Sequence, residues 1–389
     1  MTLSSERMVL LALIAALMVL PRALQRWRIP APLGAFGMGL AASFVSRDLV
    51  SDDVLHLLAT LGISAVFLFA GVELEPADFH RGRWPLLGNL AVNALVLGAL
   101  SAAAVHLLHL RWQVAALLAL ALLTPSTGFI LNALRSFGLS DDERHWVTLK
   151  AVSGELLALA VMFVVLESQS WPGLALAGAA LLALMVALPA VLLLLGRHVV
   201  RFAPGSEFSL LVMVGVIAAY VTSALGAEYL LGAFLAGFAA RLLRARLPGM
   251  ASEANLHAIE MFASFFVPFY FFDSGLHVPA QSLSVRALTL GLGLSAVVLP
   301  LRVGLVWLQR LFIRGESLRG GLRVATALTP TLVFTLVLAG LLRERFGLDD
   351  TVYGALLLYA GLSTWLPSLA LAQPFVLERM PAPRDDAPA

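Results

Sequence analysis

The chain has 389 residues, of which 60% are hydrophobic and only 13% are charged, and its formal net charge is +2. Soluble domains carry roughly 25% charged residues, so this composition, with a mean hydropathy of +0.91, excludes a string of soluble domains. Apolar runs long enough to cross a hydrocarbon core of about 30 Å recur along the whole sequence. The sequence therefore predicts an all-helical, polytopic membrane protein embedded in a lipid bilayer.

Thirteen apolar segments are expected to cross the membrane. The second and the ninth are short and rich in small residues, which is typical of tilted or partly re-entrant segments. In chain order the segments span 8–24, 30–46, 54–73, 84–108, 112–136, 145–166, 171–195, 206–224, 227–243, 256–278, 284–309, 320–342 and 351–376.

The distribution of basic residues orients these segments. If they alternate in direction, eighteen arginines fall on the side that holds the C-terminus and six on the side that holds the N-terminus. Cytoplasmic loops carry the excess of Lys and Arg. We therefore expect the N-terminus outside, the C-terminus in the cytoplasm, and a location in the inner membrane of a bacterial cell.

Several absences narrow the function. The chain contains no cysteine, which excludes disulfides, thiol nucleophiles and cysteine-bound metal centres. No phosphate-binding GxxxxGK[ST] motif occurs, which argues against an ATP-driven pump. Only one of the 26 basic residues is a lysine. We attribute this preference for arginine to a GC-rich genome and not to nucleic-acid binding. We expect no nucleic-acid partner, no enzymatic activity and no organic cofactor.

Two of the segments contain a proline beside threonines. The fifth reads ALLTPSTGFIL around Pro125, and the twelfth reads ATALTPTLVFTL around Pro330. Proline removes a backbone donor and clashes with the preceding turn, so each helix is expected to break there. The two segments are seven spans apart and cross the membrane in opposite directions. Interrupted helices at corresponding positions of inverted halves indicate a transporter's substrate site.

Four ionisable residues lie inside predicted spans: Lys150, Glu155, Asp273 and Arg302. A charge at bilayer depth costs about 2.5–3.5 kcal/mol even on lenient scales, so such residues usually have a partner or a function. Glu155 lies near mid-membrane, where burial disfavours the charged form. A carboxylate there can hold a proton or a cation but not readily both, which is the competition that an exchanger needs. The alternative is a carboxylate neutralised by a fixed basic partner.

The other three residues are expected to support the site electrostatically. Lys150 lies five residues before Glu155, roughly 140° around the helix, and near enough to the cytoplasmic end to snorkel. Arg302 stays charged and can stabilise acids or the C-terminal ends of broken helices. Asp273 either lines an entry funnel or simply ends its helix beside Gly275.

The chain resembles the monovalent cation:proton antiporters of the Kef/NapA branch (the sodium/hydrogen exchanger domain) over essentially its whole length. The resemblance rests on the order and spacing of motifs, which are FLFAGVELE at 67–75, LTPSTGFILNALRSFGL at 123–139, LLGAFLAGFAARL at 230–242, FFVPFYFFDSGL at 265–276 and LPLRVGLVW at 299–307.

This resemblance implies an NhaA/NapA-like antiporter fold of about 13 transmembrane helices, with inverted repeats and two crossing interrupted helices. It implies a dimerisation bundle, a core bundle that moves like an elevator, and a homodimer. The family places an Asp, Asn or Gln before its ion-binding Asp; here those positions are Gly154 and Glu155, and the family's basic residue maps onto Arg302. One intramembrane acid implies electroneutral exchange. Kef-type relatives often carry a C-terminal regulatory domain, whereas residues 1–389 are expected to form a single transmembrane domain.

The combined prediction is a secondary antiporter that exchanges Na⁺ or K⁺ for H⁺, with no metal beyond the transported cation. A cation channel, an organic-anion symporter of the same fold, an intramembrane enzyme and a transport-inactive relative are the alternatives. Glu155 is the predicted carrier, and the predicted oxygen ligands at the two breaks are Thr124, Ser126, Thr127, Thr329 and Thr331.

Overall fold

The computed structural model describes residues 5–371, except 46–47, 75–82, 169–170, 225–228, 245, 248, 250–251 and 315–317. Within this part of the chain all regular elements are helical. The longer helices are α1 (Ser5–Leu24), α2 (Ala31–Ser43), α3 (Asp53–Glu73), α5 (Arg83–Leu108), α6 (Trp112–Leu123), α7 (Thr127–Leu134), α8 (Asp141–Glu167), α9 (Trp171–Leu195), α10 (Glu207–Ala224), α11 (Tyr229–Leu242), α12 (Glu253–Leu276), α13 (Val285–Arg314), α14 (Leu318–Ala327), α15 (Leu332–Phe346) and α16 (Asp350–Ala370).

Every predicted segment coincides with one helix or, for the two segments with a Leu-Thr-Pro motif, with a pair of helices. Eight helices in the described residues are long and apolar enough to cross a membrane, and α14 with α15 adds a ninth if the bent pair counts as one span. The protein is therefore a multi-pass membrane protein. The count of thirteen spans stays a prediction, because α2 and α11 have only 13 and 14 residues, fewer than the roughly 20 that a perpendicular span needs.

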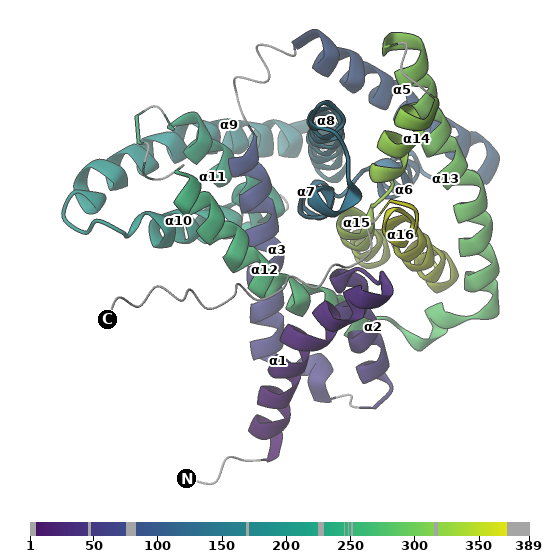
Figure 1. Ribbon diagram of the computed structural model, residues 1–389, viewed down its shortest axis with the longest axis horizontal. Coiled ribbons are helices and arrows are strands. Elements are labelled where there is room, and N and C mark those ends of the chain that lie inside the picture. Colours follow the sequence, from purple (N-terminus) through teal and green to yellow (C-terminus); the bar gives the residue numbers. More distant parts are fainter. Residues whose placement is uncertain are drawn as a thin grey trace, which may run out of the picture.

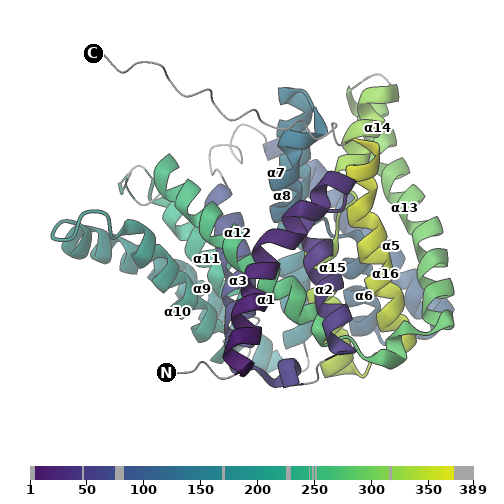
Figure 2. The same cartoon turned by 60° about the horizontal axis from the view of Figure 1, so that its bottom comes forward.

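The helices form two groups that lie side by side (Figures 1 and 2). One group contains α5–α8 and α13–α16, and we call it the core bundle. The other contains α1–α3 and α9–α12, and we call it the companion bundle. The most extensive helix packing occurs within each group, with α3 against α11 and α12 in the companion bundle and α13 against α16 in the core bundle.

Close backbone approaches hold the companion bundle together. A Cβ atom on Gly71 of α3 would lie 2.1 Å from the carbonyl oxygen of Phe234 in α11, and one on Gly237 of α11 would lie 2.1 Å from that of Leu68 in α3. These reciprocal contacts need glycine, because any larger residue would force the backbones apart. The two helices therefore pack more closely than side chains would otherwise allow.

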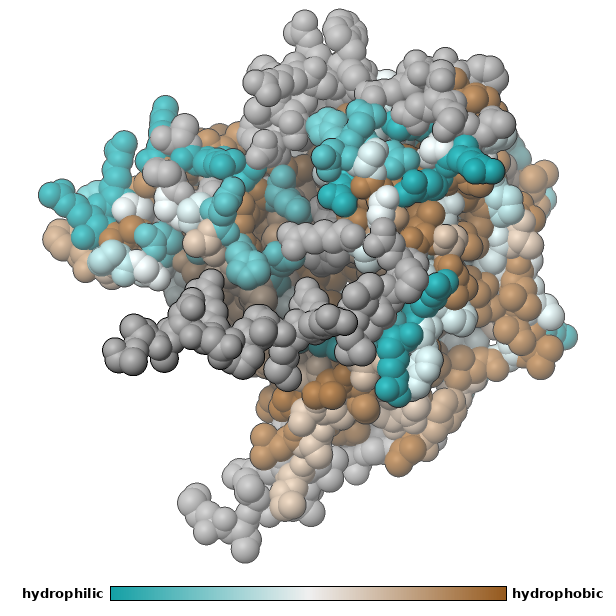
Figure 3. Space-filling view, in the orientation of Figure 1, coloured by the Kyte–Doolittle hydropathy of each residue, from teal (hydrophilic) through white to brown (hydrophobic). Residues whose placement is uncertain are grey.

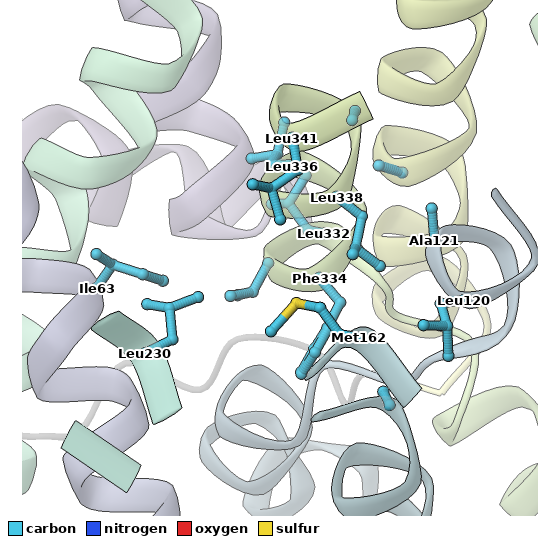
Figure 4. Packing of buried hydrophobic residues seen from close by; sticks show 14 of the residues in the cluster. Ile63, Leu120, Ala121, Met162, Leu230, Leu332, Phe334, Leu336, Leu338 and Leu341 are labelled. Carbon is cyan, nitrogen blue, oxygen red and sulfur yellow. The ribbon is translucent and has the colours of Figure 1, made fainter. Parts of the chain in front are cut away.

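Apolar side chains join the two bundles. The ring of Phe67 in α3 meets the ring of Phe334 in α15 edge to face, with centroids 5.6 Å apart. Met162 of α8 lies beside Phe334, with Ile63 of α3 and Leu230 of α11 across from them (Figure 4). The contact between the two bundles is therefore made by apolar side chains in this region.

The outer surface of the core bundle is apolar. Hydrophobic side chains gather over α13 on the right of Figure 3, where Leu292, Val297 and Leu301 are exposed. Exposed apolar side chains along a helix of this length are what lipid tails solvate. The outer face of α13 is therefore a lipid-facing surface.

Candidate functional site

The first predicted break lies between α6 and α7. Helix α6 ends at Leu123, Thr124 is extended (ψ 120°), and α7 begins at Thr127. Pro125 has no N–H to continue the helical ladder, and the residue before a proline avoids the helical region, which accounts for the extended Thr124. The proline in the sequence predicted this interruption correctly.

The second break separates α14 from α15. Residues 328–331 lie between the two helices, and the helix axes on either side are bent by 44°. Pro330 again removes the donor, and Thr331 occupies the N-cap of α15 with a non-helical φ of −127°. Both interruptions expected from the LTP motifs are therefore present.

The two breaks cross and bond directly to each other. The backbone N–H of Ser126 donates to the carbonyl oxygen of Pro330 at 2.8 Å. The Ser126 hydroxyl oxygen accepts from the N–H of Val333 at 3.0 Å, and Thr335 Oγ1 donates to the carbonyl of Ala121 at 2.7 Å. Each interruption thus supplies partners for the backbone groups that the other leaves free, as a buried break in a membrane requires.

The last helix supports the second break. Thr329 Oγ1 donates to the carbonyl of Ser363 at 3.0 Å, and the hydroxyls of Thr331 and Ser363 lie 2.9 Å apart. The hydroxyls of Thr329 and Thr331 are therefore engaged in fixing the crossing. Sequence reasoning missed Ser363, although its position among polar residues of an otherwise apolar last segment is a signal that could have indicated it.

Arg302 of α13 connects the crossing to α16. Its guanidinium donates to the carbonyls of Leu328 and Thr329 at 3.0 and 2.8 Å and to Tyr359 Oη at 3.0 Å. Tyr359 Oη in turn donates to the carbonyl of Leu122 at the first break, at 2.6 Å. Arg302 therefore holds the C-terminal end of α14, where the helix dipole is negative, as expected from the sequence. Tyr359 was not predicted.

Glu155 lies in the middle of α8. This helix starts with a capping box formed by Ser140 and Glu143, which fixes its register. Glu155 is 5% exposed. The hydroxyl of Thr127 at the start of α7 lies beside its carboxylate, without the geometry of a full hydrogen bond. The structure thus brings the predicted carrier next to the first break.

Lys150 departs from expectation. It does not snorkel to a membrane surface, because it is only 6% exposed and its ammonium donates to Gln309 Oε1 of α13. Gln309 Nε2 donates to Asn89 Oδ1 of α5 at 2.7 Å. No ion pair joins Glu155 to Lys150 or to Arg302 in the described part of the chain. Glu155 is therefore not neutralised by either of the basic residues that the sequence offered as partners.

Asp273 lies away from the crossing. It belongs to α12 in the companion bundle, which packs against α2 and α3. Its carboxylate lies 3.7 Å from His56 Nδ1 and 3.4 Å from His277 Nδ1. The structure therefore places Asp273 in a small cluster at the end of α12, apart from Glu155, Arg302 and Lys150.

A cavity of about 90 Å³ is bounded by α5, α6, α8, α13 and α14. Glu155 is not part of its wall. Gly154 faces it, and a Cβ atom there would lie 3.0 Å from Cδ of Pro125, so a larger residue would press on the first break. The polar residues and the proline of the wall are Asn93, Thr124, Pro125, Lys150, Arg302, Gln309 and Thr329.

Comparison with known proteins identifies this architecture. The model of the family described as "Sodium/hydrogen exchanger, transmembrane" matches residues 9–377. The chain belongs to this family. The predicted resemblance is thereby confirmed, and the family is one of secondary transporters.

Curated relatives include the glutathione-regulated potassium-efflux system proteins KefC of Salmonella newport and Salmonella heidelberg. Each is 27% identical over 276 residues, which are 66% of this chain and 42% of the relative. The chain thus matches less than half the length of these relatives.

A solved structure has the same fold. The sodium proton antiporter MjNhaP1 from Methanocaldococcus jannaschii superimposes with a TM-score of 0.67 and 14% identity, covering 94% of this chain and 96% of that one. The predicted antiporter fold is therefore confirmed.

Proposed function

We propose that the protein exchanges a monovalent cation, Na⁺ or K⁺, for H⁺, with Glu155 as the group that binds either ion. The observation that carries this proposal is a carboxylate only 5% exposed, with no basic partner in the described residues, beside the crossing of two broken helices. A buried carboxylate in that position is stable when it holds a proton or a cation and unstable when it holds neither. Family membership and the names of the similar proteins, which mention sodium and potassium, support both cations.

The oxygen ligands around the cation come from the first break. The hydroxyl of Thr127 lies beside Glu155 and has no hydrogen-bond partner of its own, so it is available as a ligand. Thr124 lies in the same interruption. Ser126, Thr329 and Thr331 are engaged in hydrogen bonds at the crossing, and we assign them to shaping the site.

Exchange is electroneutral in this proposal. One carboxylate accepts one proton or one monovalent cation, so the loaded site has the same charge in both states. Arg302 cannot change this balance, because a guanidinium keeps its proton and is held by two carbonyls and Tyr359.

Transport follows an elevator-like movement of the core bundle against the companion bundle. The bonds between the breaks make the crossing a single unit, and the apolar contact at Phe67 and Phe334 has no ion pair to break during sliding. In this proposal the protein works as a homodimer in the inner membrane, with its N-terminus outside and its C-terminus in the cytoplasm, as the arginine distribution favours.

The test is cation-induced proton flux in proteoliposomes. Na⁺, K⁺ and Li⁺ are added in turn to wild type, Glu155→Gln and Glu167→Gln, with the membrane potential free or clamped. Glu167 ends the same helix and serves as the matched control. We expect flux in wild type and in Glu167→Gln, no flux in Glu155→Gln, and no dependence on the potential. Wild-type flux in Glu155→Gln would place the carrier elsewhere, and a potential-dependent flux would refute electroneutral exchange.

A further inference from the structure

Lys150 carries a charge that no acid balances in the described part of the chain. Its ammonium is 6% exposed, and its hydrogen-bond acceptor is the neutral amide oxygen of Gln309. A cation at membrane depth normally pairs with an acid or with several backbone carbonyls. Neither compensates Lys150 here.

Backbone carbonyls balance the charge of Arg302, the other buried cation at this cavity. Its guanidinium donates to the carbonyl oxygens of Leu328 and Thr329, at the C-terminal end of α14. Those carbonyls carry the partial negative charge of the helix end. Arg302 therefore needs no further partner. The two carbonyls at the end of α14 bind Arg302, and Lys150 donates to Gln309 instead.

Glu155 cannot serve Lys150 either. Five residues along a helix correspond to roughly 140° of rotation and about 7.5 Å of rise, so the two side chains leave α8 in different directions. The cavity wall includes Lys150 and Gly154 but not Glu155. The carboxylate and the ammonium thus lie on opposite sides of α8.

The surroundings of Lys150 add positive charge. Lys150 Nζ lies 5.4 Å from the centre of the Trp146 ring, and the Arg310 guanidinium lies 4.6 Å from the centre of the same ring. Arg302 is also part of the cavity wall. No Asp or Glu is among the described residues that line the cavity. The buried Lys150 ammonium therefore keeps an unbalanced positive charge beside the cavity, and at a buried site of low dielectric its attraction for an anion is strengthened.

The cavity has room for a small ion. Its volume is about 90 Å³, whereas about 10–15 Å³ measured in this way is enough for one water molecule. An anion fits there with a few waters. The amide of Asn93 lines the same space and can donate to the anion. The other charged residue of the wall, Arg302, is already held by two carbonyls and Tyr359, so the wall offers one ammonium, which suits a monovalent ion.

We propose that a small monovalent inorganic anion of halide size binds in this cavity as the counter-ion of the Lys150 ammonium. The anion neutralises the buried charge and links α8 to α5 and α13. The anion's partners in this proposal, Lys150 and Asn93, are not among the proposed ligands of the cation at Glu155.

The test uses thermal unfolding and direct binding on the purified full chain in detergent. Sodium chloride or sodium bromide replaces sodium gluconate at constant sodium concentration, because gluconate is too large for the cavity. We compare wild type with Lys150→Met, Lys150→Arg and Arg111→Met, a control at an exposed basic residue outside the cavity. Radioactive chloride in equilibrium dialysis counts bound ions.

We expect halides to raise the melting temperature of wild type, Lys150→Arg and Arg111→Met by several degrees, with about one chloride bound per chain. Lys150→Met should show neither effect. Equal melting temperatures of wild type in chloride and gluconate, or chloride binding that persists in Lys150→Met, would overturn the proposal. If Lys150→Met does not fold, the absence of bound chloride in wild type or in Lys150→Arg still refutes it. Neither readout requires transport, so failure here leaves the proposed exchange at Glu155 untouched.

Discussion

The backbone N–H of Ser126 lies 2.8 Å from the carbonyl oxygen of Pro330. These two residues are 204 positions apart in the sequence, and one lies in each interrupted helix. Ser126 follows the proline of the first break, and Pro330 is the proline of the second. A buried backbone group without a partner is costly in a membrane. The direct bond removes that cost for both breaks at once, so neither interruption is stable without the other.

Loss of the Ser126 hydroxyl should weaken the crossing. Ser126→Ala leaves the N–H of Val333 without the acceptor that it now has at 3.0 Å. Removing one partner of a buried hydrogen bond costs about 1–3 kcal/mol. We expect a lower melting temperature in detergent. Ser136→Ala, at an exposed serine, is the control and should change the melting temperature little; equal effects of the two variants would contradict the role of Ser126.

Tyr359→Phe should disturb both breaks together. The hydroxyl of Tyr359 accepts from Arg302 and donates to the carbonyl of Leu122. Its removal leaves one buried donor and one buried acceptor unpaired, which costs about 1–3 kcal/mol for each group. We expect reduced stability and slower cation-induced proton flux in proteoliposomes. Tyr220→Phe, at an exposed tyrosine, should match wild type in both measurements.

Protons and cations should compete at Glu155. Because the carboxylate binds one or the other, protonation removes the cation site, and the half-saturating cation concentration must rise as the pH falls. Where most sites are protonated, we expect about a tenfold rise per pH unit, since each unit changes the proton concentration tenfold. The measurement is flux against cation concentration at several pH values. A half-saturating concentration that stays constant while only the maximal flux changes would argue against shared binding.

Gly71→Ala should separate α3 from α11. The added Cβ would meet the carbonyl oxygen of Phe234 at 2.1 Å, a distance that requires the backbones to move. Overpacking of this kind costs about 1–3 kcal/mol. Gly98→Ala is the control, because nothing lies within 4 Å of a Cβ at that position, and alanine is the better helix former. We expect a lower melting temperature for Gly71→Ala and an unchanged or higher one for Gly98→Ala.

The features that depend on local chemistry were predictable. Long apolar runs indicated the helices, and Pro125 and Pro330 indicated both breaks, because a proline acts on its own backbone wherever it occurs. The burial of Glu155 followed from its position in the middle of an apolar run.

Partners that come from distant helices were not predictable. Lys150 was expected to snorkel, but Gln309 lies 159 residues away in sequence and accepts its hydrogen bond inside the protein. Tyr359 and Ser363 escaped notice because their partners lie on other helices. Asp273 lies in an apolar segment like Glu155, and only helix packing places it in the other bundle.

The spacing of Lys150 and Glu155 around α8 keeps the carboxylate away from the ammonium. Lys150 and Glu155 are five residues apart, and deletion of a single residue between them would leave a spacing of four, at which side chains on a helix meet. The carboxylate would then be permanently satisfied by the chain's own ammonium and closed to ions from solution. One residue of spacing thus separates a carboxylate that is open to ions from one that is blocked by the chain's own ammonium.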